Sequence, residues 1–272
     1  MRTAPDSLFL TKYQALSNDY LLSDRPGDLE RLLPLVPRLC DRHVGLGADG
    51  LLLLDAPGLH LRVFNPDRSE AEKSGNGLRI AACHLVLEHG APDAFSLRTA
   101  DRDNPVRITD RRPGGIECEL DVGVPRFDPD GWLDLDTAAG RVRCRVVDIG
   151  NPHLVVFGQE VTAERCRELG PLLETDPRFP RRTNVQLVEP QGEGRARIEI
   201  WERGAGYTLG SGTSACAVAA ALHRVGLAGP TVDVVMPGGT LRVHEEGDGH
   251  LVQTGPADRV YRAEVRPSDL SS

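Results

Sequence analysis

The sequence EKSGNGLRI at residues 72–80 and the sequence LGSGTSACAVAAAL at residues 209–222 share one local design. In each, a serine and a glycine precede a run of small and apolar residues at helical spacing. Serine is a preferred helix N-cap, and the spacing predicts helices over residues 77–89 and 214–225, each followed by a glycine. The two stretches therefore predict two helices that begin in the same way, at Ser74 and at Ser211.

The similarity of the two stretches extends upstream of the serines. VFN at residues 63–65 precedes Ser74, and IWE at residues 200–202 precedes Ser211. Asn65 lies nine residues before Ser74, and Glu202 lies nine residues before Ser211. A strand, a polar loop of equal length, a Ser-Gly pair and a small-residue helix thus recur in the same order. This recurrence predicts that the chain contains two domains that arose by internal duplication.

Strand patterns dominate the rest of the sequence. Many segments alternate apolar and polar residues, which is typical of antiparallel sheets with one solvated face. Further helices are expected near residues 162–174 and, broken by proline, near residues 28–42. The polar, turn-rich residues 127–138 are interpreted as a linker. We accordingly place an N-terminal domain at residues 1–126, completed by residues 256–272, and a C-terminal domain at residues 127–255.

The composition narrows the class of protein. The chain has 272 residues, 40% hydrophobic and 26% charged, with a net charge of −8. The acidic balance and the absence of a basic run argue against nucleic-acid or membrane partners. No segment approaches the roughly 18 apolar residues of a membrane span, and no signal peptide is recognised. Six scattered cysteines without a CxxC pair argue against a zinc ribbon or disulfide framework, so we expect reduced thiols and a cytoplasmic location.

Two helix N-termini of this kind, which we call helix entrances, are suited to holding a small anion. The first turn of a helix offers unpaired backbone N–H groups and the positive end of the helix dipole, and glycine allows close approach. If two such entrances face each other, they can hold a carboxylate while proton transfer occurs on both sides of the neighbouring carbon. A serine hydroxyl is a weak acid and base, so capping or ligand binding is the expected role of both serines.

A set of motifs, taken together, resembles the diaminopimelate epimerase family along nearly the whole chain. The motifs are SNDY at 17–20, DRHVGLGADG at 41–50, FNPDRSE at 64–70, SGNG at 74–77, GNPH at 150–153, RRTN at 181–184, ERGAG at 202–206 and SGT at 211–213. The resemblance implies an α/β fold of two pseudo-symmetric domains, each a curved, mainly antiparallel sheet around a central helix. It also implies an active site between the domains and inversion of an amino-acid centre without a cofactor.

The resemblance assigns roles to individual residues. It implies that the reacting end of the substrate meets Asn18, Gly75, Asn76, Gly212 and Thr213, and that the non-reacting end meets Asn65, Asn151, Asn184, Glu202 and Arg203. The guanidinium of Arg203 presents a fork of donors suited to a carboxylate, and Glu202 can hold an ammonium group. Asp67 and Glu70 are expected to shape the loop before Ser74, and Cys83 and Cys216 are expected to lie in the core.

The chain departs from the family at the positions that carry the chemistry. The positions of Ser74 and Ser211 are cysteines in the family, one a thiolate and one a thiol. Tyr207 stands where an acidic residue is usual, and Gly50 where a glutamine is usual. Tyr207 and His153 are therefore alternative proton-transfer groups beside the two serines. His153 is equally well interpreted as a structural histidine.

Several functions remain open at this stage. The first is an epimerase or racemase of an amino acid with a second polar end, similar to diaminopimelate. The second is a cyclase, dehydratase or tautomerase acting on an amino-acid derivative in specialised biosynthesis. The third is a binding protein without turnover, and a fourth is that cysteines were exchanged for serine to trap a ligand. We expect an amino-acid ligand, no cofactor and no metal, and a homodimer is one assembly that the sequence allows.

Overall fold

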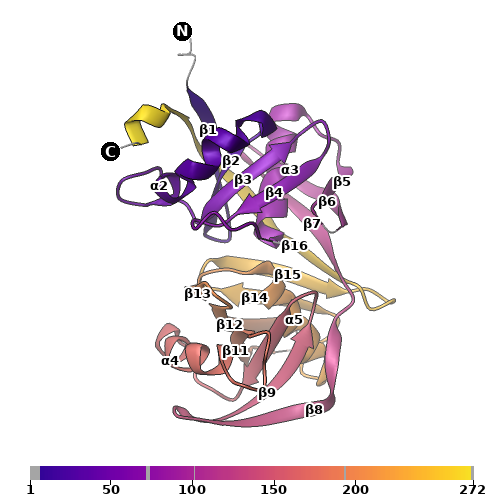
Figure 1. The fold of residues 1–272 in the computed structure, drawn as a ribbon. Coiled ribbons are helices and arrows are strands. Elements are labelled where there is room, and N and C mark those ends of the chain that lie inside the picture. Colours follow the sequence, from indigo (N-terminus) through magenta and orange to yellow (C-terminus); the bar gives the residue numbers. More distant parts are fainter. Residues whose placement is uncertain (1–6, 72–73, 101, 193, 271–272) are drawn as a thin grey trace. The chain divides into compact units, whose positions relative to one another are not determined.

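The computed structural model describes residues 7–71, 74–100, 102–192 and 194–270. The chain forms two compact units (Figure 1). The first unit comprises residues 1–120 and 256–272, and the second comprises residues 121–255. The division therefore falls after Leu120 rather than after residue 126.

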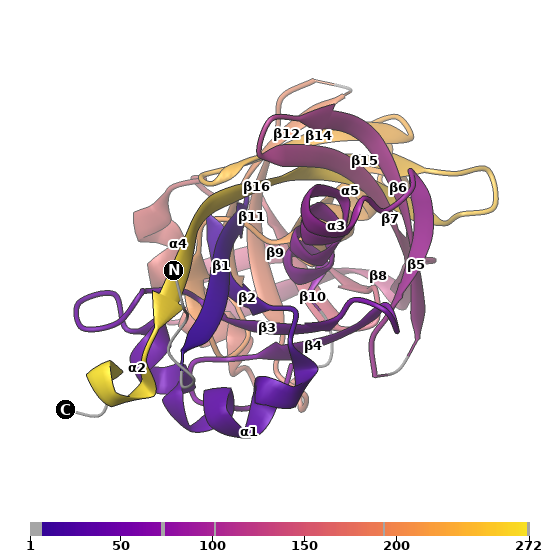
Figure 2. The ribbon, with the colours of Figure 1, turned by 90° about the horizontal axis from the view of Figure 1, so that it is seen from above.

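The first unit is a curved sheet with one long helix. Its strands are β1 (Leu8–Ala15), β2 (Asn18–Ser23), β3 (Gly50–Asp55), β4 (His60–Phe64), β5 (Ala94–Arg98), β6 (Asp103–Arg112) and most of β7 (Gly115–Gly123). Its helices are α1 (Leu29–Leu32), α2 (Val36–Cys40) and α3 (Gly75–His89), with 3-10 turns at Pro26–Asp28, Leu33–Leu35 and Pro267–Leu270. The C-terminal part of β16 (Leu251–Val265) pairs antiparallel with β1. Figure 2 shows α3 almost end-on, with the strands of this unit curving around it.

The second unit repeats this plan. Its strands are β8 (Arg126–Thr137), β9 (Gly140–Asp148), β10 (Pro152–Phe157), β11 (Asn184–Pro190), β12 (Arg195–Glu202), β13 (Gly206–Thr208), β14 (Thr231–Met236) and β15 (Gly239–Glu245). Its helices are α4 (Ala163–Glu174) and α5 (Gly212–Arg224). The N-terminal part of β16 pairs antiparallel with β15.

The direction of strand pairing supports the duplication. In the first unit, the pairs β1–β2, β2–β3, β3–β4 and β4–β5 are antiparallel, parallel, antiparallel and parallel. In the second unit, the pairs β9–β10, β10–β11, β11–β12 and β12–β14 have the same order. Each parallel pair needs a crossover connection. Short helices or α4 supply the first crossover of each unit, and α3 or α5 supplies the second.

The central helix of each unit is almost wholly buried. In α3 every residue from Gly75 to Val86 is buried, and in α5 ten of the residues between Gly212 and Leu222 are buried. Small side chains such as Ala81, Ala82 and Ala217 allow the surrounding strands to approach a helix on all sides. The helix entrance is thereby held rigidly at one end of each sheet. Within the described residues, no helix combines the length and apolar character needed to cross a bilayer.

The expected helices are confirmed, and the expected linker is wrong. Residues 77–89, 162–174 and 214–225 were predicted as helices and lie in α3, α4 and α5. Residues 127–138 form most of β8, which pairs antiparallel with β9. The polar character of this segment reflects an edge strand in which Asp and Thr alternate with Leu133 and Leu135, and only Leu135 is buried among them.

Candidate functional site

The entrance of α3 is capped by Ser74. Ser74 has extended backbone angles (φ −143°, ψ 110°), and its Oγ accepts a hydrogen bond of 2.9 Å from the N–H of Gly77. A Cβ atom at Gly77 would lie 3.2 Å from Ser74 Oγ and from Leu52 Cδ2, so a larger residue would crowd this turn. The N-cap interpretation of Ser74 is therefore confirmed. Gly75 is buried directly behind it, and Glu72 and Lys73 lie outside the described residues.

Asn76 connects the entrance of α3 to β2. Asn76 Nδ2 donates to Asn18 Oδ1 (2.9 Å), and Asn18 Nδ2 donates in turn to Asp49 Oδ2 (2.8 Å). The guanidinium of Arg79, which is 0% exposed, donates to Asn76 Oδ1. The chain of hydrogen bonds fixes the direction of both amide groups. It explains why SNDY, GADG and SGNG, three motifs far apart in the sequence, occur together.

A cluster of charges supports Asn18 from behind. Asp19 accepts from Lys12 (2.7 Å) and from Arg42 (2.7 and 3.0 Å), and Arg42 also pairs with Asp49 (2.7 Å). The backbone N–H of Asp49 donates to Asp19 Oδ1 (3.1 Å). Burial acts to raise the pKa of Asp19, but hydrogen bonds from Arg42 and Lys12 together with their positive charges hold that pKa below its usual value. Asp19 is thus ionised at neutral pH.

The loop before Ser74 is shaped by its own polar residues, as expected. Asn65 Nδ2 donates to Ser69 Oγ (2.9 Å), and the carboxylate of Asp67 accepts from the N–H and hydroxyl of Ser69 (2.9 and 2.6 Å). Glu70 forms a two-pronged ion pair with Arg62 of β4 (2.9 and 2.8 Å). Asn65 is consequently held at the end of β4, with its amide turned toward the loop.

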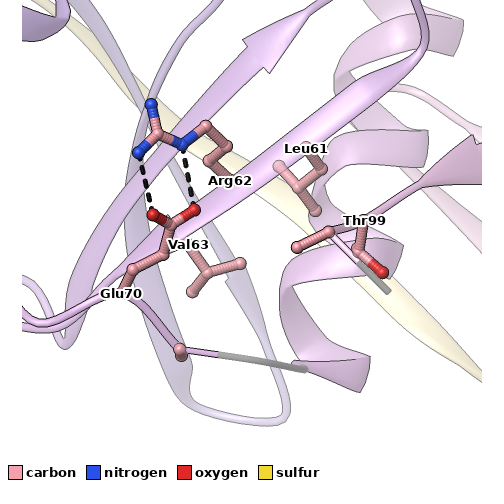
Figure 3. Close-up of a pocket in the computed structure, with 7 residues that line it drawn as sticks. Leu61, Arg62, Val63, Glu70 and Thr99 are labelled. Atoms are coloured by element: carbon pink, nitrogen blue, oxygen red, sulfur yellow. Dashed lines mark hydrogen bonds and ion pairs between the residues drawn. The ribbon is translucent and has the colours of Figure 1, made fainter. Parts of the chain in front are cut away.

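A small open pocket lies beside this ion pair (Figure 3). Its lining residues are Leu61, Arg62, Val63, Glu70, Ala71, Thr99 and Ala100. The pocket lies next to the edge of β4, where β4 and β5 share only one paired position, His60 with Arg98. None of the predicted site residues lines it among the residues described. We therefore assign the pocket no part in ligand binding.

The entrance of α5 has the same backbone as that of α3 but a different side-chain arrangement. Ser211 has φ −143° and ψ 121°, and its carbonyl accepts from the N–H of Ala215 (3.1 Å). Its hydroxyl makes no capping bond and lies 3.4 Å from Thr213 Oγ1. Ser211 is 4% exposed, and its N–H points at the sulfur of Met236 (3.5 Å). The side chain therefore does not perform the expected capping role, although the residue occupies the N-cap position.

His153 is placed to orient Asn151 rather than to meet a ligand itself. It is 0% exposed, and its Nε2 donates to Asn151 Oδ1 (3.0 Å). Gln186 Nε2 donates to His153 Nδ1 (3.1 Å) and to Ser214 Oγ on α5 (3.0 Å). This chain selects the Nε2–H tautomer and fixes the amide of Asn151. Of the two interpretations left open by the sequence, the geometry favours the structural one.

Asn184 joins two loops that carry predicted site residues. Its Nδ2 donates to the carbonyl of Pro152 (2.9 Å), and its Oδ1 accepts from the N–H of Arg203 (3.0 Å). Arg203 itself is exposed, and its Nη1 donates to the carbonyl of Arg181 (3.1 Å). The side chain of Asn184 thus aligns the 150–153 loop with the 202–206 turn.

Strand alternation separates Tyr207 from the helix entrance. Successive side chains of a strand point to opposite faces, so Asn184 and Gln186, which contacts α5, share one face of β11. Tyr207 pairs with Trp201, which pairs with Val185 of the other face. Val185 belongs to the hydrophobic cluster that includes Leu169 and Leu173 of α4, and Trp201 and Tyr207 pack against that cluster. Tyr207 therefore faces α4, away from the face that α5 covers.

The hydroxyl of Tyr207 is also occupied. It donates to Glu199 Oε2 (2.7 Å), and the guanidinium of Arg167 lies 4.0 Å from the ring centroid. Burial, followed by the hydrogen bond to and the charge of Glu199, raises the pKa of Tyr207 to about 12. Its orientation toward α4 and this raised pKa argue against Tyr207 as a proton carrier for a ligand bound beside Ser211.

The structure also brings together residues that sequence spacing does not connect. Asp24 Oδ2 lies 3.2 Å from His84 Nε2 and 3.1 Å from His89 Nε2, and Tyr13 Oη lies 3.0 Å from His84 Nδ1. The three ligand-type atoms of Asp24, His84 and His89 lie within 4.8 Å of one another. Hydrogen bonds account for these distances without an ion. We therefore treat the group as a hydrogen-bonded cluster at the C-terminal end of α3.

The cysteines are free and buried. All six lie in the interior, including Cys83 in α3 and Cys216 in α5. Burial raises the pKa of Cys83 to about 12, which keeps this thiol protonated. Cys83 and Cys216 lie inside the helices and not at the N-cap positions of Ser74 and Ser211, where the resemblance implies thiols.

The sequence matches one family model over most of its length. The model of diaminopimelate epimerase covers residues 10–123 and 145–260. A diaminopimelate epimerase of Erythrobacter litoralis is 36% identical over 96% of this chain and 98% of its own length. Diaminopimelate epimerase 2 of a Nostoc species is 38% identical over 93% of this chain and 94% of its own length.

Solved structures support the fold. A protein of Pseudomonas aeruginosa, described as a predicted epimerase, superposes with a TM-score of 0.69 at 19% identity and covers 94% of this chain and 98% of its own. A hydroxyproline epimerase of Agrobacterium vitis, with trans-4-hydroxy-L-proline bound, gives a TM-score of 0.68 at 15% identity and covers 97% and 94%. The family model, the relatives and the repeated fold agree, and the chain belongs to the diaminopimelate epimerase family.

Proposed function

We propose that the protein is a cofactor-independent isomerase that acts on an amino acid with a second polar end, similar to diaminopimelate. The observation that carries the proposal is the turn at Glu202 and Arg203. Its backbone is fixed by Asn184, while the guanidinium of Arg203 is exposed and bonds only through Nη1 among the residues described. The remaining donors, Nε and Nη2, suit a carboxylate. Glu202 beside it suits an ammonium group.

The two helix entrances are the proposed site of the reacting end. The N–H groups at Gly75 and Asn76 and those at Gly212 and Thr213 belong to first helical turns, which favour a carboxylate. When a proton passes from the neighbouring carbon to solvent water or hydroxide, charge develops on that carboxylate. Fixed N–H donors stabilise this charge without reorganisation. Asn18, held by Asp49 and Asn76, can add an amide donor.

The serines are proposed to bind ligand rather than to carry protons. A hydroxyl needs an adjacent base before it acts as a nucleophile or base. Among the residues described, Ser74 Oγ bonds to a backbone N–H and Ser211 Oγ to another hydroxyl. Neither bond activates the oxygen. Each O–H group can still donate a hydrogen bond to a bound carboxylate.

The same observation favours a second candidate, a binding protein without turnover. In this case the turn of Glu202 and Arg203 and the two helix entrances hold an amino acid, and no proton leaves its α-carbon. The two candidates share every binding residue. They differ only in whether the α-hydrogen exchanges with solvent.

An exchange experiment in D2O distinguishes the candidates. The protein is incubated with diaminopimelate isomers and a panel of polar amino acids, and α-deuterium is measured by mass spectrometry and proton NMR. The isomerase predicts deuterium at one α-carbon of a bound substrate. Arg203→Ala should abolish the exchange, whereas Arg178→Ala, which removes an exposed arginine paired with Asp176, should not. Measurable binding without exchange would favour the binding protein. Unchanged ligand affinity in Arg203→Ala would refute the assignment of Arg203 to the second polar end of the substrate.

A further inference from the structure

We propose that Glu174 is a positioning residue that holds the turn of Glu202 and Arg203 in its ligand-binding shape. The inference rests on the proposed function, because it assigns that turn to the second polar end of the substrate. Glu174 is the last residue of α4 and is 4% exposed. It was not singled out by any motif in the sequence. Its partners, however, lie on both sides of Glu202 and Arg203.

Three donors converge on the carboxylate of Glu174. Trp201 Nε1 donates to Oε2 (2.7 Å), the backbone N–H of Gly204 donates to Oε1 (2.7 Å), and the guanidinium of Arg182 also donates to Oε1. Trp201 directly precedes Glu202, and Gly204 directly follows Arg203. One carboxylate therefore fixes both ends of the two-residue segment that we assign to the ligand.

The position of Glu174 is unfavourable unless these donors are present. A carboxylate at the C-terminal end of a helix meets the negative end of the helix dipole. Burial adds a desolvation cost that only charge-assisted hydrogen bonds offset. A buried acid at this place thus depends on Trp201, Gly204 and Arg182. The dependence is mutual, because the turn also loses its fixed geometry when the acid is removed.

The segment before β11 strengthens the same arrangement. Arg182 has φ +58°, a left-handed conformation that is uncommon for a residue with a side chain. It is held by a hydrogen bond from its N–H to the carbonyl of Phe179 (2.7 Å) and by Glu174. The neighbouring carbonyl of Arg181 accepts from Arg203 Nη1 (3.1 Å). Glu174 therefore acts on Arg203 by two routes, through Gly204 and through the Arg181–Arg182 backbone.

The first arm of the test observes the turn without any ligand. The chain has two tryptophans, Trp132 and Trp201, so ¹⁵N-indole NMR gives one reporting signal and one internal control. Glu174→Gln should shift the Trp201 indole signal and leave that of Trp132 unchanged. It should also speed hydrogen exchange at the Gly204 amide. An unshifted Trp201 signal with unchanged Gly204 exchange would overturn the inference.

The second arm measures affinity for meso-diaminopimelate by calorimetry. Glu174→Gln should weaken binding by about tenfold to a hundredfold, because the charged acceptor of the turn is lost. Glu168→Gln is the matched control on α4, since in the part of the chain that the structure describes Glu168 pairs with the partly exposed Arg165, and the affinity of this variant should equal that of wild type. Affinity of folded Glu174→Gln within about twofold of wild type would overturn the positioning role.

The two arms separate failure of the inference from failure of the proposed function. If wild type binds no amino acid while the Trp201 indole shifts, the proposed function fails and the tie between Glu174 and the turn stands. If Glu174→Gln does not fold, Trp201→Phe removes one donor and keeps the aromatic packing. That variant should weaken binding severalfold and raise KM more than it lowers kcat, whereas a loss of folded protein would lower kcat alone.

Discussion

The entrances of α3 and α5 share a backbone and differ in what holds their side chains. Ser74 and Ser211 have the same φ and similar ψ, yet only Ser74 caps its helix through its hydroxyl. The hydroxyl of Ser211 is buried and contacts only Thr213 at 3.4 Å among the residues described. The two N-caps therefore share a backbone geometry, while the role of the side chain differs between them.

The supports of the two entrances differ as well. The first unit uses charges, with Asp19 and Asp49 paired to Lys12 and Arg42 behind Asn18. The second unit uses an imidazole, amides and a hydroxyl at α5, where His153 and Gln186 connect Asn151 to Ser214. The first entrance should therefore lose stability when one of its charged side chains is removed.

Asp19→Ala is expected to have the largest effect on stability. It removes the carboxylate that pairs with both Lys12 and Arg42, and it leaves the poorly exposed ammonium of Lys12 without its ion-pair partner. We expect the free energy of unfolding to fall by roughly 3 kcal/mol, as measured by chemical denaturation. Asp28→Ala removes a helix-surface pair with Arg31 and should cost about 0.5 kcal/mol. Equal losses of unfolding free energy in the two variants would contradict the claim that the ion pairs of Asp19 stabilise the first unit more than a surface pair does.

The same acid makes the first entrance sensitive to low pH. The pKa of Asp19 is lowered on folding, so its ionised form stabilises the protein above the unfolded pKa of about 3.9. This contribution is lost as the pH falls through the folded pKa. The stability difference between wild type and Asp19→Ala should therefore be constant from pH 7 to pH 5 and shrink below about pH 4. A stability difference that grows as the pH falls would contradict the lowered pKa of Asp19 in the folded protein.

Ser74→Ala is expected to cost about 1 kcal/mol of unfolding free energy. The substitution removes the acceptor for the N–H of Gly77 at the first turn of a buried helix. Thermal and urea unfolding should agree on this loss. Ser74→Thr keeps a hydroxyl and should recover most of it. A loss below about 0.3 kcal/mol would show that the cap does not contribute to stability.

Ser211→Ala is expected to have the smallest effect, within about 0.5 kcal/mol of wild type. Its hydroxyl makes no capping bond, and its contact with Thr213 is long for a hydrogen bond. The same unfolding measurement on both serine variants tests the comparison directly. A loss at Ser211 as large as the loss at Ser74 would show that the two entrances are supported alike.

Much of the fold was predictable because its signals are local. The Ser-Gly pairs, the small residues after them and the glycines at the helix ends predict α3 and α5 from sequence alone. Strand alternation predicts most of the sheet. The interpretation of residues 127–138 as a linker was wrong, because a solvated edge strand and a linker are both polar and turn-rich.

The contacts behind the site were not predictable, since they join residues far apart in sequence. The bond of Glu174 to Gly204 spans 30 residues, and that of Asn76 to Asn18 spans 58. The sequence made Tyr207 a candidate proton-transfer group because of its place in a motif. The face of the sheet on which Tyr207 lies follows from strand register instead. His153 likewise depends on Gln186, which no motif marks.

We propose that backbone N–H groups and the Arg203 turn bind the ligand, with the serines as further ligand contacts. The most direct measurement is α-deuterium incorporation by wild type and by the double variant Ser74→Ala with Ser211→Ala, at matched concentrations of folded protein. We expect exchange in wild type and, in the double variant, exchange reduced by about tenfold or less. Complete loss of exchange in a folded double variant that still binds substrate would contradict this proposal, because the serines would then be the proton carriers.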